Sequence, residues 1–144
     1  MQSNILEVGC GTGQLSLFLS RFQRRIFAID LAIKSLELGE NFRKKNEIEN
    51  VFFSRMNIFN LFFPNNFFDV IISNGVLHHT ENPKLAFFEL TKHLKKNGYI
   101  VIGLYHKYGR IYNRLTKFMI NTFGNTFKIL DKKTLDKNTS KEKR

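Results

Sequence analysis

The sequence has one cysteine, two prolines and no tryptophan among its 144 residues. A lone Cys10 excludes a disulfide bond within the chain, which fits a reducing compartment, so we expect a cytoplasmic protein. No apolar run approaches the roughly 20 residues that cross a bilayer. The first residues show no basic segment followed by an apolar stretch of signal-peptide length. We therefore expect no membrane span.

Acidic residues are also scarce, because 12 Asp and Glu stand against 23 Lys and Arg and give a formal net charge of +11. The excess of basic over acidic residues is uneven along the chain. Residues 1–104 hold 12 basic and 9 acidic residues, whereas residues 105–144 hold 11 and 3. We expect one domain over residues 1–123, followed by a basic, frayed or disordered tail over residues 124–144. Charge alone leaves nucleic acid open as a partner, but we favour a small-molecule substrate.

Apolar residues make up 42% of the chain, with 16 Phe, as in a globular domain. Apolar, β-branched runs typical of strands lie at residues 4–8, 25–30, 51–54, 69–73 and 99–105. Helical patterns lie at residues 13–22, 31–45, 82–98 and 110–123. Strands that alternate with helices predict right-handed crossovers. The fold class is therefore α/β, a doubly wound, mostly parallel sheet with helices on both faces.

The first three helical segments carry apolar side chains at helical spacing. Segment 82–98 is the clearest, with Pro83 near its start and Gly98 as the expected stop. The apolar positions that we expect to face the sheet are Leu15, Phe18, Leu19 and Phe22, then Ile33, Leu36 and Phe42, and finally Leu85, Phe88, Leu90 and Leu94.

A glycine-rich stretch, "GCGTG" (9–13), directly follows the first strand. Glycine adopts positive φ and lets the backbone approach a ligand. Dinucleotide sites use G-x-G-x-x-G, whereas the spacing here is G-x-G-x-G with Glu7 just upstream. A carboxylate beside the loop disfavours a pyrophosphate and suits a ligand that carries an ammonium and a sulfonium. The alternative interpretation is a tight turn between strand and helix.

The second strand ends in Asp30. An acidic residue at this place accepts hydrogen bonds from both hydroxyls of a ribose in related folds. It would serve equally well as the N-cap of the helix that begins near Leu31. The two strand ends together indicate a ribose beside a glycine loop.

Four stretches in order, "ILEVGCGTGQLS", "IFAIDLA", "NIFNLFFPNNFFDVIISNGVLHHTENP" and "LKKNGYIVIGLY", resemble the motifs of class I S-adenosylmethionine-dependent methyltransferases over about residues 4–105. The resemblance implies a Rossmann-like sheet in the order 3-2-1-4-5, S-adenosylmethionine as cofactor and S-adenosylhomocysteine as product. The cofactor-binding positions that it implies are Glu7, Gly9, Cys10, Gly11, Gly13, Asp30, Leu31, Asn57, Ile58 and Asn74.

The chain departs from the family pattern after the third strand. Asn57 stands where an acidic residue usually faces the adenine amine, although an amide oxygen can accept the same hydrogen bond. The backbone of Ile58 would meet the ring edge. Leu61-Phe62-Phe63 replaces the common Leu-Pro-Phe.

The end of the fourth strand, "SNGVLHH", is expected to face the methyl group. A base is needed only if the acceptor must lose a proton, and His79 is our candidate because imidazole titrates near neutrality. Its neighbour His78 points another way if His79 faces the pocket, and the alternative is that both are packing residues. We expect no metal ion, since no third ligand is suitably spaced.

Residues 124–144 show no sign of the two strands that usually complete this fold. The strand at 99–105 would then be an uncovered apolar edge, where a homodimer could form. Three hypotheses remain: a methyltransferase acting on a small metabolite, a truncated or non-catalytic domain that binds cofactor and needs a partner chain, and a nicotinamide-dependent oxidoreductase.

Overall fold

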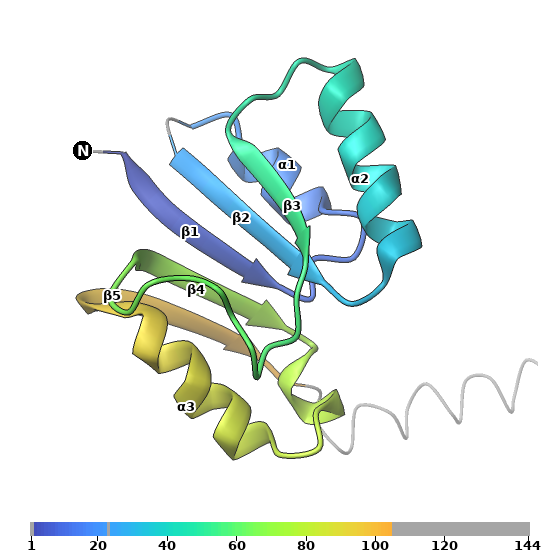
Figure 1. Ribbon diagram of the computed structural model, residues 1–144. Helices are drawn as coiled ribbons and strands as arrows, with labels where there is room; N and C mark the ends of the chain where they lie inside the picture. The colour runs from blue at the N-terminus through green and yellow to red at the C-terminus, as the bar shows by residue number, and fades with distance from the viewer. Residues whose placement is uncertain (1, 23, 105–144) are drawn as a thin grey trace, which may run out of the picture. The chain divides into compact units, whose positions relative to one another are not determined.

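The structure, a computed structural model, describes residues 2–22 and 24–104. The expected helix at 110–123, the boundary at residue 123 and the tail lie outside the described residues. The sheet has five strands in the order β3-β2-β1-β4-β5 (Figure 1), and every pairing between them is parallel. The strands are β1 (Ser3–Val8), β2 (Arg24–Asp30), β3 (Val51–Arg55), β4 (Phe68–Asn74) and β5 (Leu94–Gly103). The helices are α1 (Gln14–Leu19), α2 (Ile33–Lys45), the 3₁₀ turn η1 (Leu77–His79) and α3 (Pro83–His93).

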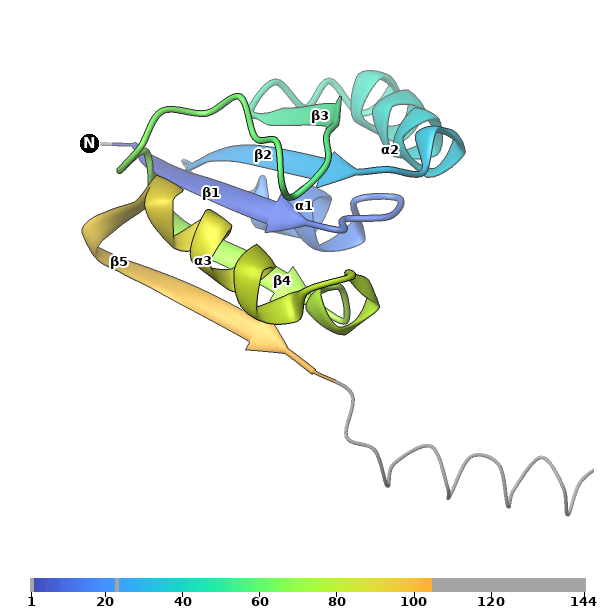
Figure 2. The same ribbon diagram turned by 60° about the horizontal axis from the view of Figure 1, so that its bottom comes forward.

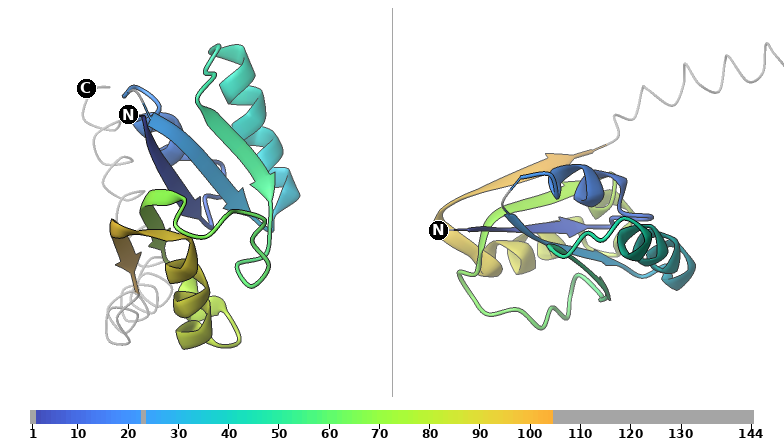
Figure 3. Two further views of the ribbon diagram at one scale, coloured as in Figure 1. Left: turned by 60° about the vertical axis from the view of Figure 1, so that its left-hand side comes forward. Right: turned by 90° about the horizontal axis from the view of Figure 1, so that it is seen from above.

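Helices cover both faces of this sheet, as the sequence predicts. Leu6 of β1 packs in one buried cluster with Ala86 and Leu90 of α3. Its neighbour Ile5, which points to the opposite face, packs with Leu19 of α1 in another cluster. Figure 1 shows α1 behind the sheet and α3 in front of it, and Figure 3 repeats the arrangement from two other sides. The doubly wound α/β prediction is confirmed.

The crossover from β3 to β4 contains no helix and is packed by aromatic side chains. The rings of Phe63 and Phe67 lie 4.9 and 5.0 Å from that of Phe68, all in edge-on contact. Phe27 of β2 lies in the same group. Figure 2 shows this segment passing over the strands on the side of α3. The phenylalanines thus supply the cover that a helix would give.

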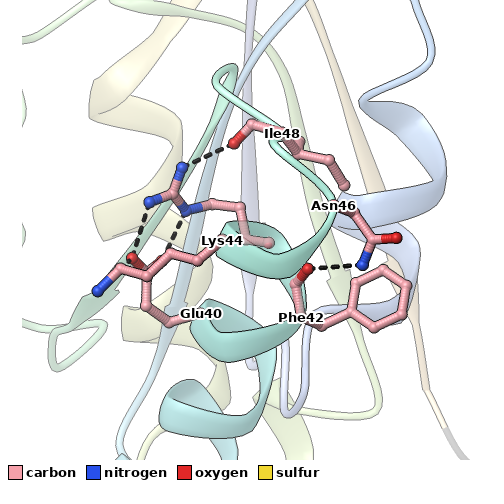
Figure 4. Close-up of polar contacts among 6 residues, drawn as sticks. Glu40, Phe42, Lys44, Asn46 and Ile48 are labelled. Carbon is pink, nitrogen blue, oxygen red and sulfur yellow. Dashed lines mark hydrogen bonds and ion pairs between the residues drawn. The ribbon is translucent and has the colours of Figure 1, made fainter.

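The end of α2 is fastened to the segment that leads into β3. Arg43 donates to Glu40 at 2.7 Å and to the carbonyl of Ile48 at 2.7 Å. Asn46 donates to the carbonyl of Phe42 at 2.8 Å and so closes the last turn (Figure 4). Because Glu40 accepts from Arg43, its pKa is lowered. These contacts fix where β3 begins.

The prediction of a helix over residues 82–98 is wrong at its C-terminal end. The helix ends at His93, and Leu94 already pairs with Phe68 as the first residue of β5. Gly98 therefore lies inside a strand, at a place where a β-carbon would sit 2.9 Å from the carbonyl of Asp69. Close packing of neighbouring strands, and not a helix stop, accounts for this glycine.

Several of the apolar helix positions do not face the sheet as expected. Phe18, Leu85 and Phe88 are 55%, 47% and 50% exposed. In α3 the buried side chains are Ala86, Leu90 and His93, so the inward face is rotated by about one residue. The prediction fails here because hydrophobic spacing favours the larger Leu85 and Phe88, whereas the small Ala86 is the residue that is fully buried.

Among the described strands, β5 pairs with β4 alone. Its side chains Tyr99 and Val101 are 75% and 54% exposed. No helix in the described part of the chain is long and apolar enough to cross a membrane.

Candidate functional site

A pocket of about 430 Å³ lies at the carboxyl ends of the central strands. Its size falls within the roughly 300–1,000 Å³ of small-molecule sites. It adjoins β1, where the strand order reverses, which is the usual ligand position in such sheets. Its walls are formed by Val8, Gly9, Ile29, Asp30, Leu31, Met56, Asn57, Ile58, Phe59, Gly75, Val76, His79, Thr80 and Glu81.

The pocket brings together residues that the sequence singles out from four separate stretches. Of the expected site residues, its walls include Gly9, Asp30, Leu31, Asn57, Ile58 and His79. The others, which lie nearby in the chain but outside these walls, are Glu7, Cys10, Gly11, Gly13 and Asn74. Which of them touch a ligand stays a prediction.

The glycine loop begins at Gly9, whose N–H donates to the carbonyl of Ile29 at 2.8 Å. Its φ is 71°, a left-handed conformation that favours glycine. A β-carbon here would lie 2.1 Å from a methyl group of Val76. Gly9 is therefore required by close packing between the ends of β1 and β4 in addition to its backbone angle.

The other two loop glycines differ in their surroundings. Gly13 has a φ of 74°, and a β-carbon there would lie 2.3 Å from the ring of Phe53. Gly39 of α2 approaches the same ring, so Phe53 is held between two glycines. At Gly11, with a φ of 55°, no protein atom lies within 4 Å of the β-carbon position. The loop is therefore not packed against other protein atoms at Gly11.

Asp30 connects the glycine loop to the end of β2. One carboxylate oxygen accepts from the N–H of Gly11 at 2.8 Å, and the other accepts from the N–H of Ala32 at 2.8 Å. The N-cap interpretation is wrong, because α2 begins at Ile33 with Ala32 as its N-cap and has no side-chain cap hydrogen bond. The bond from Ala32 to Asp30 instead shapes the turn before the helix. It does not exclude a ribose, because each carboxylate oxygen has a second lone pair and Asp30 forms part of the pocket wall.

Glu7 is buried, and one oxygen of its carboxylate accepts two hydrogen bonds from Ser16 of α1. The backbone N–H of Ser16 donates at 3.0 Å, and its hydroxyl donates to the same oxygen. Burial raises the pKa of Glu7 above its usual value of 4.5, although the two bonds from Ser16 oppose this. The structure shows this carboxylate engaged with α1.

Asn57 begins a tight turn after β3. Its side-chain oxygen accepts from the N–H of Phe59 at 3.0 Å, and its carbonyl accepts from the N–H of Asn60 at 2.9 Å. The turn places Ile58, which is only 7% exposed, between the core and the pocket. An Asn suits this turn because its short amide bonds to the backbone two residues on.

Cys10, in the middle of the loop, is 8% exposed. Burial and the nearby carboxylates of Glu7 and Asp30 raise the pKa of its thiol to about 12. The thiol is therefore protonated and unreactive at neutral pH. Its role here is to pack beside Ala28 and Leu36.

The two histidines that follow β4 differ in their position relative to the pocket. His79 lies in the pocket wall and His78 does not, with their rings 4.0 Å apart. Asn74 lies beside β5, since a β-carbon at Gly103 would meet its side-chain oxygen. No group of three or more His, Cys, Asp or Glu suited to a metal ion occurs among the described residues.

Sequence reasoning missed much of the wall. Met56 and Phe59 flank the predicted pair Asn57–Ile58, so their position next to these residues could have identified them. Thr80 and Glu81 follow His79 directly. Val76 lies within the stretch "SNGVLHH" that was expected to face the site, and its contact with Gly9 shows why it forms part of the wall.

Comparison with known proteins agrees with this geometry. A family model described as a methyltransferase domain matches residues 6–102. The uncharacterized methyltransferase YcgJ of Bacillus subtilis is 27% identical over 97 residues, which are 67% of this chain and 38% of that protein. Its crystal structure aligns with a TM-score of 0.66 and 26% identity, covering 70% of this chain and 43% of that one.

Two further relatives are named for methylation of oxygen. The ubiquinone biosynthesis O-methyltransferase of Rickettsia canadensis is 29% identical over 108 residues, covering 75% of this chain and 45% of the relative. The malonyl-[acyl-carrier protein] O-methyltransferase of a Paenibacillus strain is 31% identical over 104 residues, covering 69% and 38%. The chain thus spans less than half the length of each. Because the family model matches more than half of the sequence, the chain belongs to the class I S-adenosylmethionine-dependent methyltransferases.

Proposed function

We propose that the pocket binds S-adenosylmethionine and that the protein transfers its methyl group to a small-molecule acceptor. One observation carries the proposal. The glycine loop, Asp30 and the turn at Asn57–Ile58 lie far apart in the sequence and yet meet around one pocket. Each is a place at which the family pattern puts cofactor contacts.

The chemistry of the wall fits an adenosine group. The carboxylate of Asp30 has lone pairs left for ribose hydroxyls. Leu31, Met56 and Ile58 offer apolar surface for a planar base. The amide of Asn57 lies on an exposed turn and is suited to hydrogen bonding with an exocyclic amine.

The bound cofactor supplies a methyl group already activated by its sulfonium. The residues of the chain therefore mainly align donor and acceptor, a contribution that reaches several kcal/mol. His79 lies in the wall and is the candidate to accept a proton from the acceptor. The names of two relatives support an oxygen nucleophile as the acceptor atom.

The test has two stages. Calorimetry with S-adenosylhomocysteine should give saturable binding, and NAD at the same concentration should give none. Transfer of a labelled methyl group is then measured with phenols, carboxylic acids and amines as acceptors. Absence of binding at saturating S-adenosylhomocysteine would overturn the proposal, and NAD binding would favour the oxidoreductase hypothesis.

A second candidate is a cofactor-binding domain that works only with a partner chain, and β5 favours it. Among the described strands β5 pairs with β4 alone, so its other edge is a template for pairing with another chain. Tyr99 and Val101 add exposed apolar surface on the same strand. A second copy is the simplest partner. Light scattering that shows a dimer, together with binding but no methyl transfer, would support this candidate, and a monomer with activity would exclude it.

A further inference from the structure

Ser16 is the most deeply buried polar residue of α1, with no exposed surface. Both of its donors, the backbone N–H and the hydroxyl, are directed at the same oxygen of Glu7. The two residues are nine positions apart. Their contact therefore closes the whole segment that contains the glycine loop.

A buried carboxylate bonded to a hydroxyl is costly to place in a protein interior. Burial raises the pKa of Glu7, which means that the surroundings disfavour its charge. Two hydrogen bonds from one residue of α1 hold the carboxylate there, and this geometry ties the end of β1 to α1 across the glycine loop.

The loop is held at three places. Its start is held by the carbonyl of Ile29, which accepts from Gly9 and Cys10. Its middle is held by Asp30 through Gly11. Its exit into α1 is held by two contacts: the N–H of Gly13 donates to the carbonyl of Cys10 at 2.8 Å, and Ser16 donates to Glu7.

We infer that Ser16 and Glu7 form a positioning pair that fixes the exit of the glycine loop for cofactor binding. Glu7 then acts through Ser16 and does not itself contact the ligand. This agrees with its absence from the pocket wall, which includes Gly9 two residues later. The inference rests on the proposed function and specifies how this site is preorganised.

The alternative is direct contact between the Glu7 carboxylate and the ammonium of the cofactor. The two interpretations differ in whether the negative charge of Glu7 is needed for binding. Glu7→Gln keeps an oxygen that can accept both hydrogen bonds from Ser16 but loses the negative charge. Ser16→Ala removes the hydroxyl bond and leaves the charge in place.

The experiment measures S-adenosylhomocysteine affinity in folded protein for the wild type, Ser16→Ala, Glu7→Ala, Glu7→Gln and the double variant Glu7→Ala/Ser16→Ala. Ser20→Ala is the matched control, because its hydroxyl donates to the carbonyl of Leu17 in the same helix. We expect Ser16→Ala to bind about tenfold more weakly, which equals about 1.4 kcal/mol. Ser20→Ala and Glu7→Gln should bind within about threefold of the wild type. The double variant should bind no more weakly than Glu7→Ala, because the two side chains act as one unit.

A large loss of affinity in Glu7→Gln with normal binding by Ser16→Ala would overturn the inference in favour of direct contact. Unchanged affinity in folded Ser16→Ala with only a lower melting temperature would overturn it in favour of a purely structural pair. If Ser16→Ala does not fold, the Glu7 variants decide: weaker binding by folded Glu7→Ala beside near-wild-type binding by Glu7→Gln supports the inference, and near-wild-type binding by both overturns it. Failure of the wild type to bind any S-adenosylhomocysteine is a different result, because it would refute the proposed function.

Discussion

The carboxylate of Asp30 accepts a hydrogen bond from the backbone N–H of Gly11 at 2.8 Å, and so joins the end of β2 to the loop after β1. This contact means that one residue both shapes the glycine loop and faces the pocket. The two roles can be separated by experiment.

Replacement of Asp30 by Ala should weaken S-adenosylhomocysteine binding by about 1.5–3 kcal/mol, the range for hydrogen bonds to charged groups. It should also lower the melting temperature, since Gly11 and Ala32 lose their acceptor. The ribose role is isolated by comparing S-adenosylhomocysteine with its 2′,3′-dideoxy analogue. Wild-type protein should prefer the former, and the variant should show little preference. A preference that survives unchanged in the variant would assign Asp30 to the loop alone.

Gly11→Val should abolish cofactor binding in protein that remains folded. Beyond its chain neighbours no protein atom lies within 4 Å of the β-carbon position, so the side chain meets no packing partner. Its φ of 55° strains a β-branched residue, so the variant should also have a lower melting temperature. Calorimetry measures binding, and circular dichroism checks the fold. Gly13→Val is the contrasting variant, because its side chain would collide with the ring of Phe53 and should prevent folding. Normal binding by a folded Gly11→Val protein would contradict our view of the loop.

His79→Asn should lower the rate of methyl transfer with a phenolic or carboxylic acceptor roughly 10²–10⁴-fold, the range of general-base catalysis. Cofactor affinity should change little, because the substitution keeps a polar side chain of smaller size. Equal rates of methyl transfer in both proteins would remove His79 from the mechanism.

The thiol of Cys10 should resist alkylation at neutral pH in the folded protein. Its pKa is raised to about 12 by burial, so the reactive thiolate is almost absent. Because the chain has one cysteine, labelling reports on this site alone. Iodoacetamide should modify it at least a hundredfold faster, an order of magnitude set by the pKa shift, once urea unfolds the chain. Rapid labelling of native protein would show that the loop is more open than described.

Glu7→Gln should change how stability depends on pH. Because burial raises the folded-state pKa above the usual 4.5, the folded wild type binds this proton more tightly than the unfolded chain does. Its stability therefore falls as pH rises from about 4.5 through the raised pKa. The variant lacks this proton, so its free energy of unfolding relative to the wild type should rise over that window and then level off. Urea unfolding at several pH values measures the difference, and a flat difference would contradict it.

The fold and most of the strand ends could be predicted from the sequence because they depend on local patterns. Alternating apolar runs gave the five strands within a few residues, apart from β5, which begins at Leu94. The glycine loop and Asp30 were recognisable because their positions follow directly from strand ends. The side chains by which each helix contacts the sheet could not be predicted, as the exposed Phe18 and Phe88 show. They depend on which helix face packs most closely on the strands, and hydrophobic spacing does not report this.

By itself, the sequence determined the order of strands and helices, the spacing of the loop glycines and the membership of a methyltransferase family. Only the tertiary structure decided what each glycine is for: Gly13 faces Phe53, and Gly11 faces open space. It also decided that Glu7 turns to Ser16 and that His79, not His78, enters the pocket wall. The reason is physical. Periodicity records which residues avoid water, whereas contacts between distant segments depend on how closely the folded elements approach.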